Sequence, residues 1–414
     1  MRRSAQYRRS IREVTQVMTV GAFAILLIIL PTQIQAQTYH VLYAFNGGLD
    51  GAEPWAGITV DAAGNLYGAT MYGGGSNNRG TVFKLKHNGS GWIINPLYSF
   101  IPSDGQYPEA RVIIGPNGTL YGTNTFGGAF DHGTVYNVRP PANPCRATLC
   151  PWAEIVLYSF TGLADGGDPG YGDLNFDHAG NLYGTTTQGG ANRGGVIYEL
   201  QRSGGSWMES VLYSLDAYTS GIYPYSGVIF DSAGNLYGTA TAAGGGSGAV
   251  FRLTPSGSGW VENTLYTFPR DESTGAGPYG TVVFDQSGNL YGTTALGGAY
   301  YAGTVYELTP SGGNWIESVL YSFADYGPYV GLTMDAAGNL YGTTRFGGSY
   351  QHGTVFKLSR SGGAWTYTEL HAFGGDDDGG DPLDGVTLDA NGNLYGTASN
   401  GGAHGLGVVF EITP

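Results

Sequence analysis

After an apolar N-terminal segment, short apolar runs alternate with glycine-rich polar stretches, and none has the apolar spacing of a helix. In the fourth copy of this pattern, GVIF (227–230) is apolar enough for a strand buried on both faces, and DSAGN (231–235) predicts a tight turn. LYGTAT (236–241) is rich in strand formers, GAVFRLTP (248–255) alternates like a half-buried strand, and WVENTLYTF (260–268) follows a further turn. Each copy therefore predicts a meander of four antiparallel strands.

The pattern occurs seven times. Aligned on the tyrosine of the Leu-Tyr-Gly core, successive copies are 54, 62, 54, 54, 50 and 54 residues apart. A glycine-punctuated period of this size is typical of a radial array of sheets. We expect one tyrosine ring per copy to pack between neighbouring blades. These tyrosines are Tyr67, Tyr121, Tyr183, Tyr237, Tyr291, Tyr341 and Tyr395.

The two ends of the repeat region complement each other. The segment YHVLYAF (39–45) resembles the fourth strand of a copy, such as SVLYSF (318–323), whereas GVVFEITP (407–414) is a third strand with no fourth strand behind it. Pairing these ends would close the ring and leave no open gap between blades. We predict an all-β fold, a single seven-bladed β-propeller of four-stranded antiparallel blades over residues 37–414, with the last blade closed by the N-terminal strand.

One aspartate recurs at the first hairpin turn in six of the seven copies, and Gly115 replaces it in the second copy. Carboxylates in such numbers suit calcium or catalysis, but six equivalents at one turn are explained more simply as caps for free backbone amides. The same explanation covers DDDGGDP (376–382), which lacks the ligand order of an EF-hand. The six turn residues are Asp61, Asp177, Asp231, Asp285, Asp335 and Asp389.

Residues 1–36 have the pattern of a secretory signal peptide. Five arginines precede an apolar run at 17–30, and a small-residue cleavage pattern ends at Ala36. The run is shorter than the roughly 20 residues that cross a bilayer, so we expect no stable membrane span after cleavage. The sequence thus predicts an exported protein, either secreted or held in the periplasm or at the cell surface.

Charge excludes some partners of the exported part. The leader holds five of the 18 basic residues and one of the 32 acidic residues, so 13 basic and 31 acidic residues remain, a net charge of −18. Nucleic acids and anionic membrane surfaces need a basic footprint and are therefore not expected as partners. Cys145 and Cys150 lie in the insertion that lengthens the second copy, and in an exported protein we expect them to form a local disulfide.

The residue that enters the innermost strand of each copy is a candidate for ligand binding, because these positions meet on one face of a propeller. Five of the seven are large aromatic residues beside amide, hydroxyl and carboxylate groups, which suits a polysaccharide or a peptide. Packing between blades is the alternative explanation of the same rings. The seven residues are Trp55, Glu109, Tyr171, Tyr225, Tyr279, Tyr329 and Leu383.

Catalytic chemistry has weaker support. Glu109 and Asp131 form the one non-repeating acidic pair on this face, and they are the candidates for glycoside cleavage. Three histidines, His132, His352 and His404, follow Gly-Gly pairs in other loops, and we expect solvated side chains there rather than metal ligands. We find no nucleotide loop, HExxH motif or Ser-His-Asp arrangement, and we expect no metal and no cofactor.

The motif GNLYGTT…GG…GTV[FY]xL followed by W…LYSF resembles the bacterial GloVer tandem-repeat family of choice-of-anchor proteins. The resemblance covers nearly all of the exported chain, in seven copies, and implies a β-propeller-like repeat protein of the envelope or the extracellular space. We therefore expect a non-enzymatic, monomeric binding or scaffold protein that recognises a glycan or peptide on one propeller face. The alternative is a carbohydrate-active enzyme, a hydrolase or lyase, on the same scaffold.

Overall fold

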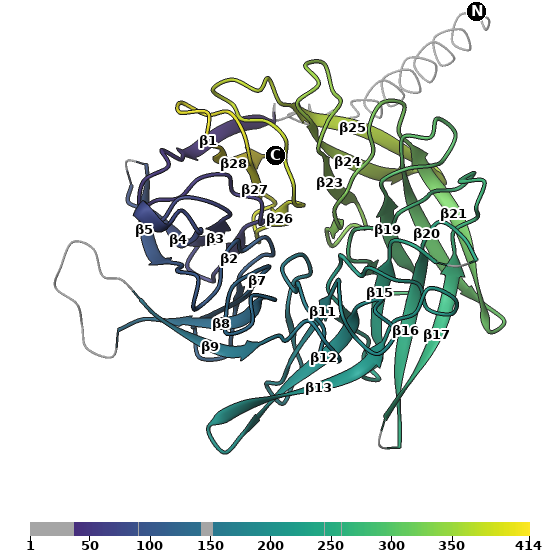
Figure 1. Ribbon diagram of the computed structural model, residues 1–414. Coiled ribbons are helices and arrows are strands. Elements are labelled where there is room, and N and C mark those ends of the chain that lie inside the picture. Colours follow the sequence, from purple (N-terminus) through teal and green to yellow (C-terminus); the bar gives the residue numbers. More distant parts are fainter. Residues whose placement is uncertain (1–36, 90, 142–151, 244, 258) are drawn as a thin grey trace, which may run out of the picture. The chain divides into compact units, whose positions relative to one another are not determined.

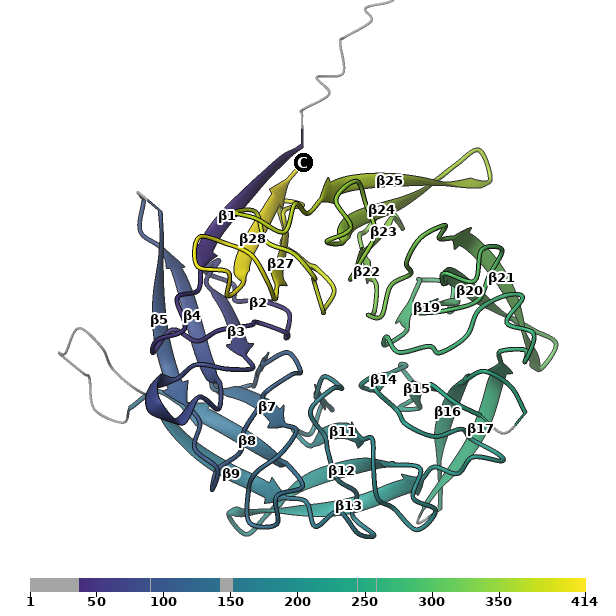
Figure 2. The same cartoon turned by 45° about the horizontal axis from the view of Figure 1, so that its top comes forward.

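The computed structural model describes residues 37–89, 91–141, 152–243, 245–257 and 259–414. Within the compact unit Thr38–Thr413, seven four-stranded antiparallel sheets are arranged in a ring (Figure 1). Figure 2 shows the sheets around a common centre, with the shortest strand of each sheet innermost. The fold is a seven-bladed β-propeller, as the sequence predicts. We number the blades 1 to 7 from the sheet that begins with β2 (Thr59–Val60).

Each blade runs outwards through four strands in chain order. The innermost strands are β2, β6 (Ile113–Ile114), β10 (Asn175–Phe176), β14 (Ile229–Phe230), β18 (Val283–Phe284), β22 (Thr333–Met334) and β26 (Thr387–Leu388). The second strands are β3 (Leu66–Thr70), β7 (Leu120–Asn124), β11 (Leu182–Thr186), β15 (Leu236–Ala240), β19 (Leu290–Thr294), β23 (Leu340–Thr344) and β27 (Leu394–Ala398). The third strands are β4 (Thr81–His87), β8 (Thr134–Arg139), β12 (Val196–Ser203), β16 (Ala249–Ser256), β20 (Thr304–Ser311), β24 (Thr354–Ser361) and β28 (Val408–Thr413).

The outer strands are the longest, and in six blades they belong to the same copy of the repeat as the inner ones. They are β5 (Trp92–Ser99), β9 (Ala153–Ser159), β13 (Ser206–Ser214), β17 (Gly259–Thr267), β21 (Asn314–Ser322), β25 (Ala364–Ala372) and, in blade 7, β1 (Thr38–Ala44). A short 3-10 turn, η1 (Gly75–Asn77), lies between β3 and β4. The described part of the chain contains no helix that is both long enough and apolar enough to cross a membrane.

The burial of two strands in each blade, the innermost and the third, differs from the expectation. The innermost strands are two residues long and only half buried, whereas we expected runs such as Gly227–Phe230 to be buried on both faces. The second strands are buried along their whole length, and the third strands are buried on both faces in their first half rather than alternating. The reason is packing in the ring, since these middle strands have a neighbouring blade on each side.

The glycine of the Leu-Tyr-Gly core makes room for an aromatic ring of the same blade. A Cβ atom on Gly238 would lie 2.6 Å from Cζ of Phe251, and one on Gly122 would lie 2.4 Å from the hydroxyl oxygen of Tyr136. Neither glycine has a positive φ angle, so steric room and not backbone conformation requires the glycine. This contact explains why the glycine recurs in every copy.

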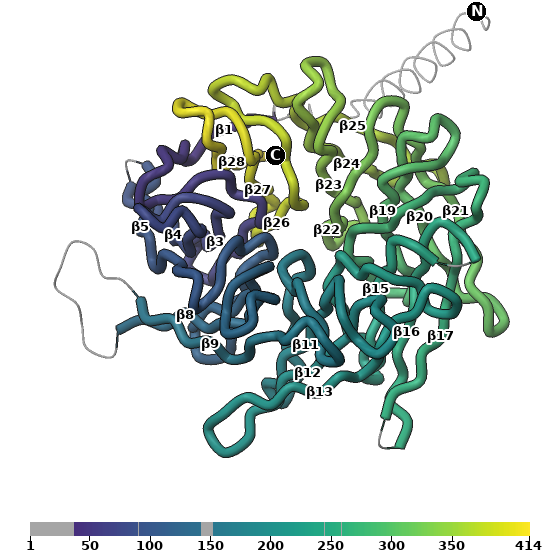
Figure 3. The backbone as a smooth tube through the Cα atoms, in the orientation of Figure 1, coloured from purple at the N-terminus to yellow at the C-terminus, as the bar shows by residue number. Residues whose placement is uncertain are grey.

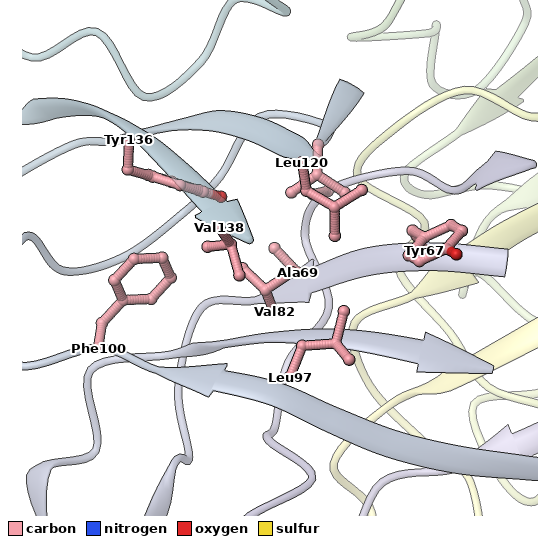
Figure 4. Close-up of a cluster of buried hydrophobic side chains, with 10 residues drawn as sticks. Tyr67, Ala69, Val82, Leu97, Phe100, Leu120, Tyr136 and Val138 are labelled. Carbon is pink, nitrogen blue, oxygen red and sulfur yellow. The ribbon is translucent and has the colours of Figure 1, made fainter. Parts of the chain in front are cut away.

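Seven clusters of buried apolar side chains lie in the gaps between blades. Figure 4 shows the cluster between blades 1 and 2, where Val82 and Phe100 of blade 1 face Tyr136 and Val138 of blade 2. The tyrosines of the repeated core are buried in these gaps, and Tyr237 meets Phe284 of the next blade edge to face at 4.9 Å. The predicted packing role of these rings is confirmed.

The repeated aspartate caps its turn through four hydrogen bonds. Oδ1 of Asp231 accepts the amides of Ala233 and Asn235, both at 2.9 Å. Its Oδ2 accepts the Asn235 side-chain amide at 2.7 Å and the Tyr237 hydroxyl at 3.0 Å. The other five aspartates make the same four bonds, so the carboxylates serve the turn, as predicted.

The N-terminal strand completes the last blade. β1 pairs antiparallel with β28, from Thr38 opposite Thr413 to Ala44 opposite Val408. In the tube of Figure 3 the purple start of the described chain lies beside its yellow end. The predicted closure is therefore confirmed. The predicted leader, residues 1–36, and the predicted pair Cys145 and Cys150 lie outside the described residues.

Candidate functional site

One pocket at the centre of the ring is lined by all seven residues that enter the innermost strands. Each of them lies four residues before its innermost strand begins, so the propeller brings seven equivalent positions together. The cavity measures about 230 Å³, below the roughly 300–1,000 Å³ of pockets for drug-sized ligands. We call this cavity the mouth pocket. We call the seven residues the mouth ring: Trp55, Glu109, Tyr171, Tyr225, Tyr279, Tyr329 and Leu383.

Four tyrosines of blades 3 to 6 form a continuous arc of the mouth ring. The ring centres of Tyr171 and Tyr225 are 4.9 Å apart, those of Tyr225 and Tyr279 are 5.1 Å apart, and those of Tyr279 and Tyr329 are 5.4 Å apart. Tyr171 is 40% exposed and Tyr329 is 36% exposed, so the rings support each other and still face solvent. Both explanations from the sequence therefore describe part of this geometry, because the rings pack on each other across blades and also line the pocket.

The phenols of three tyrosines in this arc, Tyr171, Tyr225 and Tyr279, are neutral at physiological pH. Burial, and then the nearby carboxylate of Glu109, raise the pKa of Tyr171, and burial likewise raises the pKa of Tyr225 and Tyr279. A neutral phenol both donates and accepts hydrogen bonds. The arc thus offers apolar ring surface together with hydroxyl groups.

Glu109 occupies the tyrosine position in blade 2. Burial raises the pKa of its carboxyl group from 4.5 to about 7, although the hydroxyls of Thr125 and Tyr171 lower it, and the charge of Asp168 raises it further. Its Oε2 atom is buried and has no hydrogen-bond partner in the described part of the protein. Glu109 is therefore a carboxyl group that changes charge near neutral pH and has hydrogen-bonding capacity left for a ligand.

Asp131, the proposed partner of Glu109, is not among the residues that line the pocket. It is exposed in the loop between β7 and β8, where its Oδ1 accepts the amide of Gly127 at 3.0 Å and the side chain of Gln106 at 3.4 Å. The structure thus places Glu109 in the pocket and gives Asp131 a role in the conformation of its own loop.

Three charged side chains that the sequence analysis missed meet beside the pocket. Arg111 Nε lies 3.6 Å from Oδ2 of Asp173, and Arg111 Nη2 lies 3.4 Å from Oδ2 of Asp384. Asp173 and Asp384 line the mouth pocket, and Arg111 and Asp173 line a second cavity of about 370 Å³ beside the innermost strands. This ion triad therefore lies between the two cavities.

The triad also joins blades that are distant in sequence. Asp384 of blade 7 accepts the amide of Gly57, which leads into blade 1, at 2.7 Å, and Asp173 of blade 3 accepts the amide of Arg111, which leads into blade 2, at 2.9 Å. Burial and the charge of Asp384 raise the pKa of Asp173 more than Arg111 lowers it. A signal for Arg111 and Asp173 was present in the sequence, because they replace glycine at the position two residues after the mouth ring in blades 2 and 3.

The histidines singled out in the sequence lie in separate loops. His352 is exposed, and its Nδ1 lies 3.8 Å from Oδ1 of Asp381. His132 is half-buried, and its ring packs against Gly162, where a Cβ atom would lie 2.6 Å from the ring. His404 is exposed. Within the described ranges, no three His, Cys, Asp or Glu side chains come together as a metal site.

Comparison with known families identifies the repeat. Residues 29–153, 153–272 and 243–414 match the Gloeobacter/Verrucomicrobia repeat, so the chain belongs to this family. A comparison with curated proteins gives no match.

Solved structures share the fold at low sequence identity. An ulvan lyase, from a new family of polysaccharide lyases, is 11% identical with a TM-score of 0.54, and the match covers 90% of this chain and 95% of the lyase. A putative 6-phosphogluconolactonase from Bacteroides uniformis is 14% identical with a TM-score of 0.50, over 77% of this chain and 84% of that one. A putative oxidoreductase (glucose dehydrogenase) from Thermus thermophilus is 15% identical with a TM-score of 0.43, over 91% and 100%. At these identities the likeness is one of fold alone.

Proposed function

We propose that this member of the Gloeobacter/Verrucomicrobia repeat family is an exported, non-enzymatic binding protein whose mouth ring holds a sugar ring of a glycan. The observation that carries the proposal is the meeting of five half-exposed aromatic residues and three carboxyl side chains around one cavity of about 230 Å³. Aromatic faces stack on the apolar face of a pyranose, while phenol and carboxyl groups bond its hydroxyls. A cavity of this size fits one ring better than a long segment of chain.

Export belongs to the same proposal. Its support is the leader pattern of residues 1–36 and the acidic, charge-poor composition, with 12% charged residues. Polymeric glycans occur outside the cytoplasm, in the compartment to which such a leader directs a protein. A glycan-binding role and an exported location are therefore consistent with each other.

A glycan array tests the proposal. We expect the wild-type protein to bind a defined set of glycans and Tyr279→Ala to bind them about fivefold less tightly, since one stacking contact contributes about 1 kcal/mol. Tyr218→Ala is the matched control, because Tyr218 is 90% exposed and is not part of the pocket lining. Binding that is equal in both variants, or no binding to any glycan, would refute the proposal.

A carbohydrate-active enzyme is the second candidate, and the raised pKa of Glu109 favours it. A carboxyl group with a pKa of about 7 is suited to donate or accept a proton at neutral pH. The ulvan lyase of similar fold acts on a polysaccharide, which is consistent with this candidate. An array-selected glycan that is cleaved by the wild type and merely bound by Glu109→Gln would establish the enzyme and overturn the non-enzymatic proposal.

A further inference from the structure

One cation in the mouth pocket has no counterpart in the other blades. Arg345 directly follows β23 in blade 6 and lines the pocket. The other six blades have an uncharged residue at this position. These residues are Met71, Thr125, Thr187, Thr241, Ala295 and Ser399. A charge that departs from the repeat inside a shared cavity points to a role in that cavity rather than in the blade.

The guanidinium group of Arg345 is not neutralised by the described part of the protein. No carboxylate lies within ion-pair distance of it there, and its buried Nε has no hydrogen-bond acceptor. Its Cζ lies 4.8 Å from the ring centre of Phe346, a contact that orients the group. Arg111, in contrast, is held between two carboxylates. Buried nitrogen without an acceptor is unfavourable, so a ligand that supplies an acceptor gains from binding there.

Glu109 lies across the pocket from Arg345. Blade 2 and blade 6 are separated by blades 3 to 5 on one side of the ring and by blades 7 and 1 on the other. The tyrosine arc spans the first of these gaps, and Trp55 and Leu383 occupy the second. The pocket thus has a cation at one edge, a carboxyl group with an unpartnered Oε2 at the other, and aromatic walls between them.

We infer that the ligand of the mouth pocket is a uronic acid residue, with its carboxylate on Arg345, a hydroxyl on Glu109 and a face of its ring on the tyrosine arc. This inference rests on the proposed glycan-binding function and names the class of sugar. A guanidinium group matches a carboxylate through two parallel hydrogen bonds, which a neutral sugar cannot form. An acidic peptide would supply the carboxylate but no saturated ring for the aromatic walls.

The charge of the whole protein restricts the form of this ligand. With a net charge of −18 after removal of the expected leader, the protein repels a long polyanion. One unpaired arginine neutralises a single carboxylate. The pocket therefore takes a short oligouronide or the end of a chain rather than an internal segment of a continuous polyanion.

Calorimetric titration of the full protein with matched saccharides tests the inference. The probes are trimers of galacturonate and of glucuronate, each compared with its methyl ester, which keeps the ring and removes the charge. We expect at least one acid trimer to bind ten- to a hundredfold more tightly than its ester, as a charge-assisted bidentate contact predicts. Arg345→Gln should bring the acid down to the level of the ester, and Arg345→Lys should give an intermediate preference because it keeps the charge without the fork.

The control and the remaining outcomes separate the two proposals. Arg360→Gln removes an exposed arginine at the end of an outer hairpin and should keep the preference for the acid. Equal binding of acid and ester by the wild type, an unchanged preference in Arg345→Gln, or equally tight binding of triglutamate would overturn the uronate inference alone. Failure of every saccharide, including the glycans of the array, would overturn the proposed function itself.

Discussion

Replacing Arg111 by methionine should destabilise the propeller. Methionine keeps a long, unbranched side chain but leaves the carboxylates of Asp173 and Asp384 without their shared counter-ion. Both carboxylates line the pocket and are only partly exposed to water. The perturbation therefore acts at a point that ties blades 1, 2, 3 and 7 together.

The structure sets the expected magnitude. Nitrogen and oxygen atoms 3.4 and 3.6 Å apart attract by about 5 kcal/mol each at an effective dielectric constant of about 20, before the cost of desolvation. Removing one partner of a fully buried pair costs about 3–5 kcal/mol. Here the side chains of Arg111, Asp173 and Asp384 are 22%, 38% and 22% exposed, and both carboxylates keep backbone amide donors. We therefore expect a loss of about 2–3 kcal/mol in the free energy of unfolding.

Thermal and urea unfolding measure this loss. With an unfolding entropy of about 2 cal/mol/K per residue, a domain of this size should melt roughly 3 °C lower. Asp384→Asn introduced into Arg111→Met should recover part of the loss, since it removes one of the two uncompensated charges. The exposed Arg360→Met should melt like the wild type. An Arg111→Met protein as stable as the wild type, or no recovery in the double variant, would refute the assigned role of the triad.

Three further results are expected. Asp231→Ala should lower the free energy of unfolding by about 1–2 kcal/mol in urea titrations, whereas Asp231→Asn should lose less, because it keeps one side-chain acceptor. Burial raises the pKa of Glu154 to about 8 and the pKa of Glu209 and Glu317 to about 7. These carboxyl groups hold their protons more tightly in the folded protein, so the free energy of unfolding should fall as pH rises from about 5 to 8. Gln at all three positions should flatten this slope in urea titrations. Ionisation of Glu109, with a pKa of about 7, should weaken binding of an acidic ligand between pH 6 and pH 8 in calorimetric titrations, and Glu109→Gln should abolish this dependence. A pH dependence of stability in the triple Gln variant, or of binding in Glu109→Gln, that equals that of the wild type would contradict the corresponding reasoning.

The architecture was accessible from the sequence because each copy carries its own local instructions. The cap at Asp231, the core tyrosine Tyr237 and Gly238 all act within one blade or on its immediate neighbour. Ring closure was accessible for a similar reason, since β1 and β28 carry the patterns of an outer and a third strand. The extent to which single strands are buried was not accessible from the sequence, because it depends on neighbouring blades that the periodicity does not describe.

The pocket was predictable only where it follows the repeat. The mouth ring occupies one equivalent position in every copy, so its convergence follows from the ring symmetry. Arg111 and Asp384 are 273 residues apart in sequence, and only the closed ring shows that they meet. Arg345 does not follow from what the copies share, because its signal lies in a departure from them.

Trp55 allows the most direct test of the claim that the mouth ring binds a glycan. Of the seven tryptophans, Trp55 alone lines the mouth pocket in the described structure, while Trp92, Trp207 and the others lie on or beside outer strands. A fluorescence titration of the wild-type protein with an array-selected glycan should give a saturable change in tryptophan emission. In Trp55→Phe this change should disappear, while calorimetry still detects weakened binding. A change of the same size and midpoint in Trp55→Phe would place the ligand elsewhere and contradict the account.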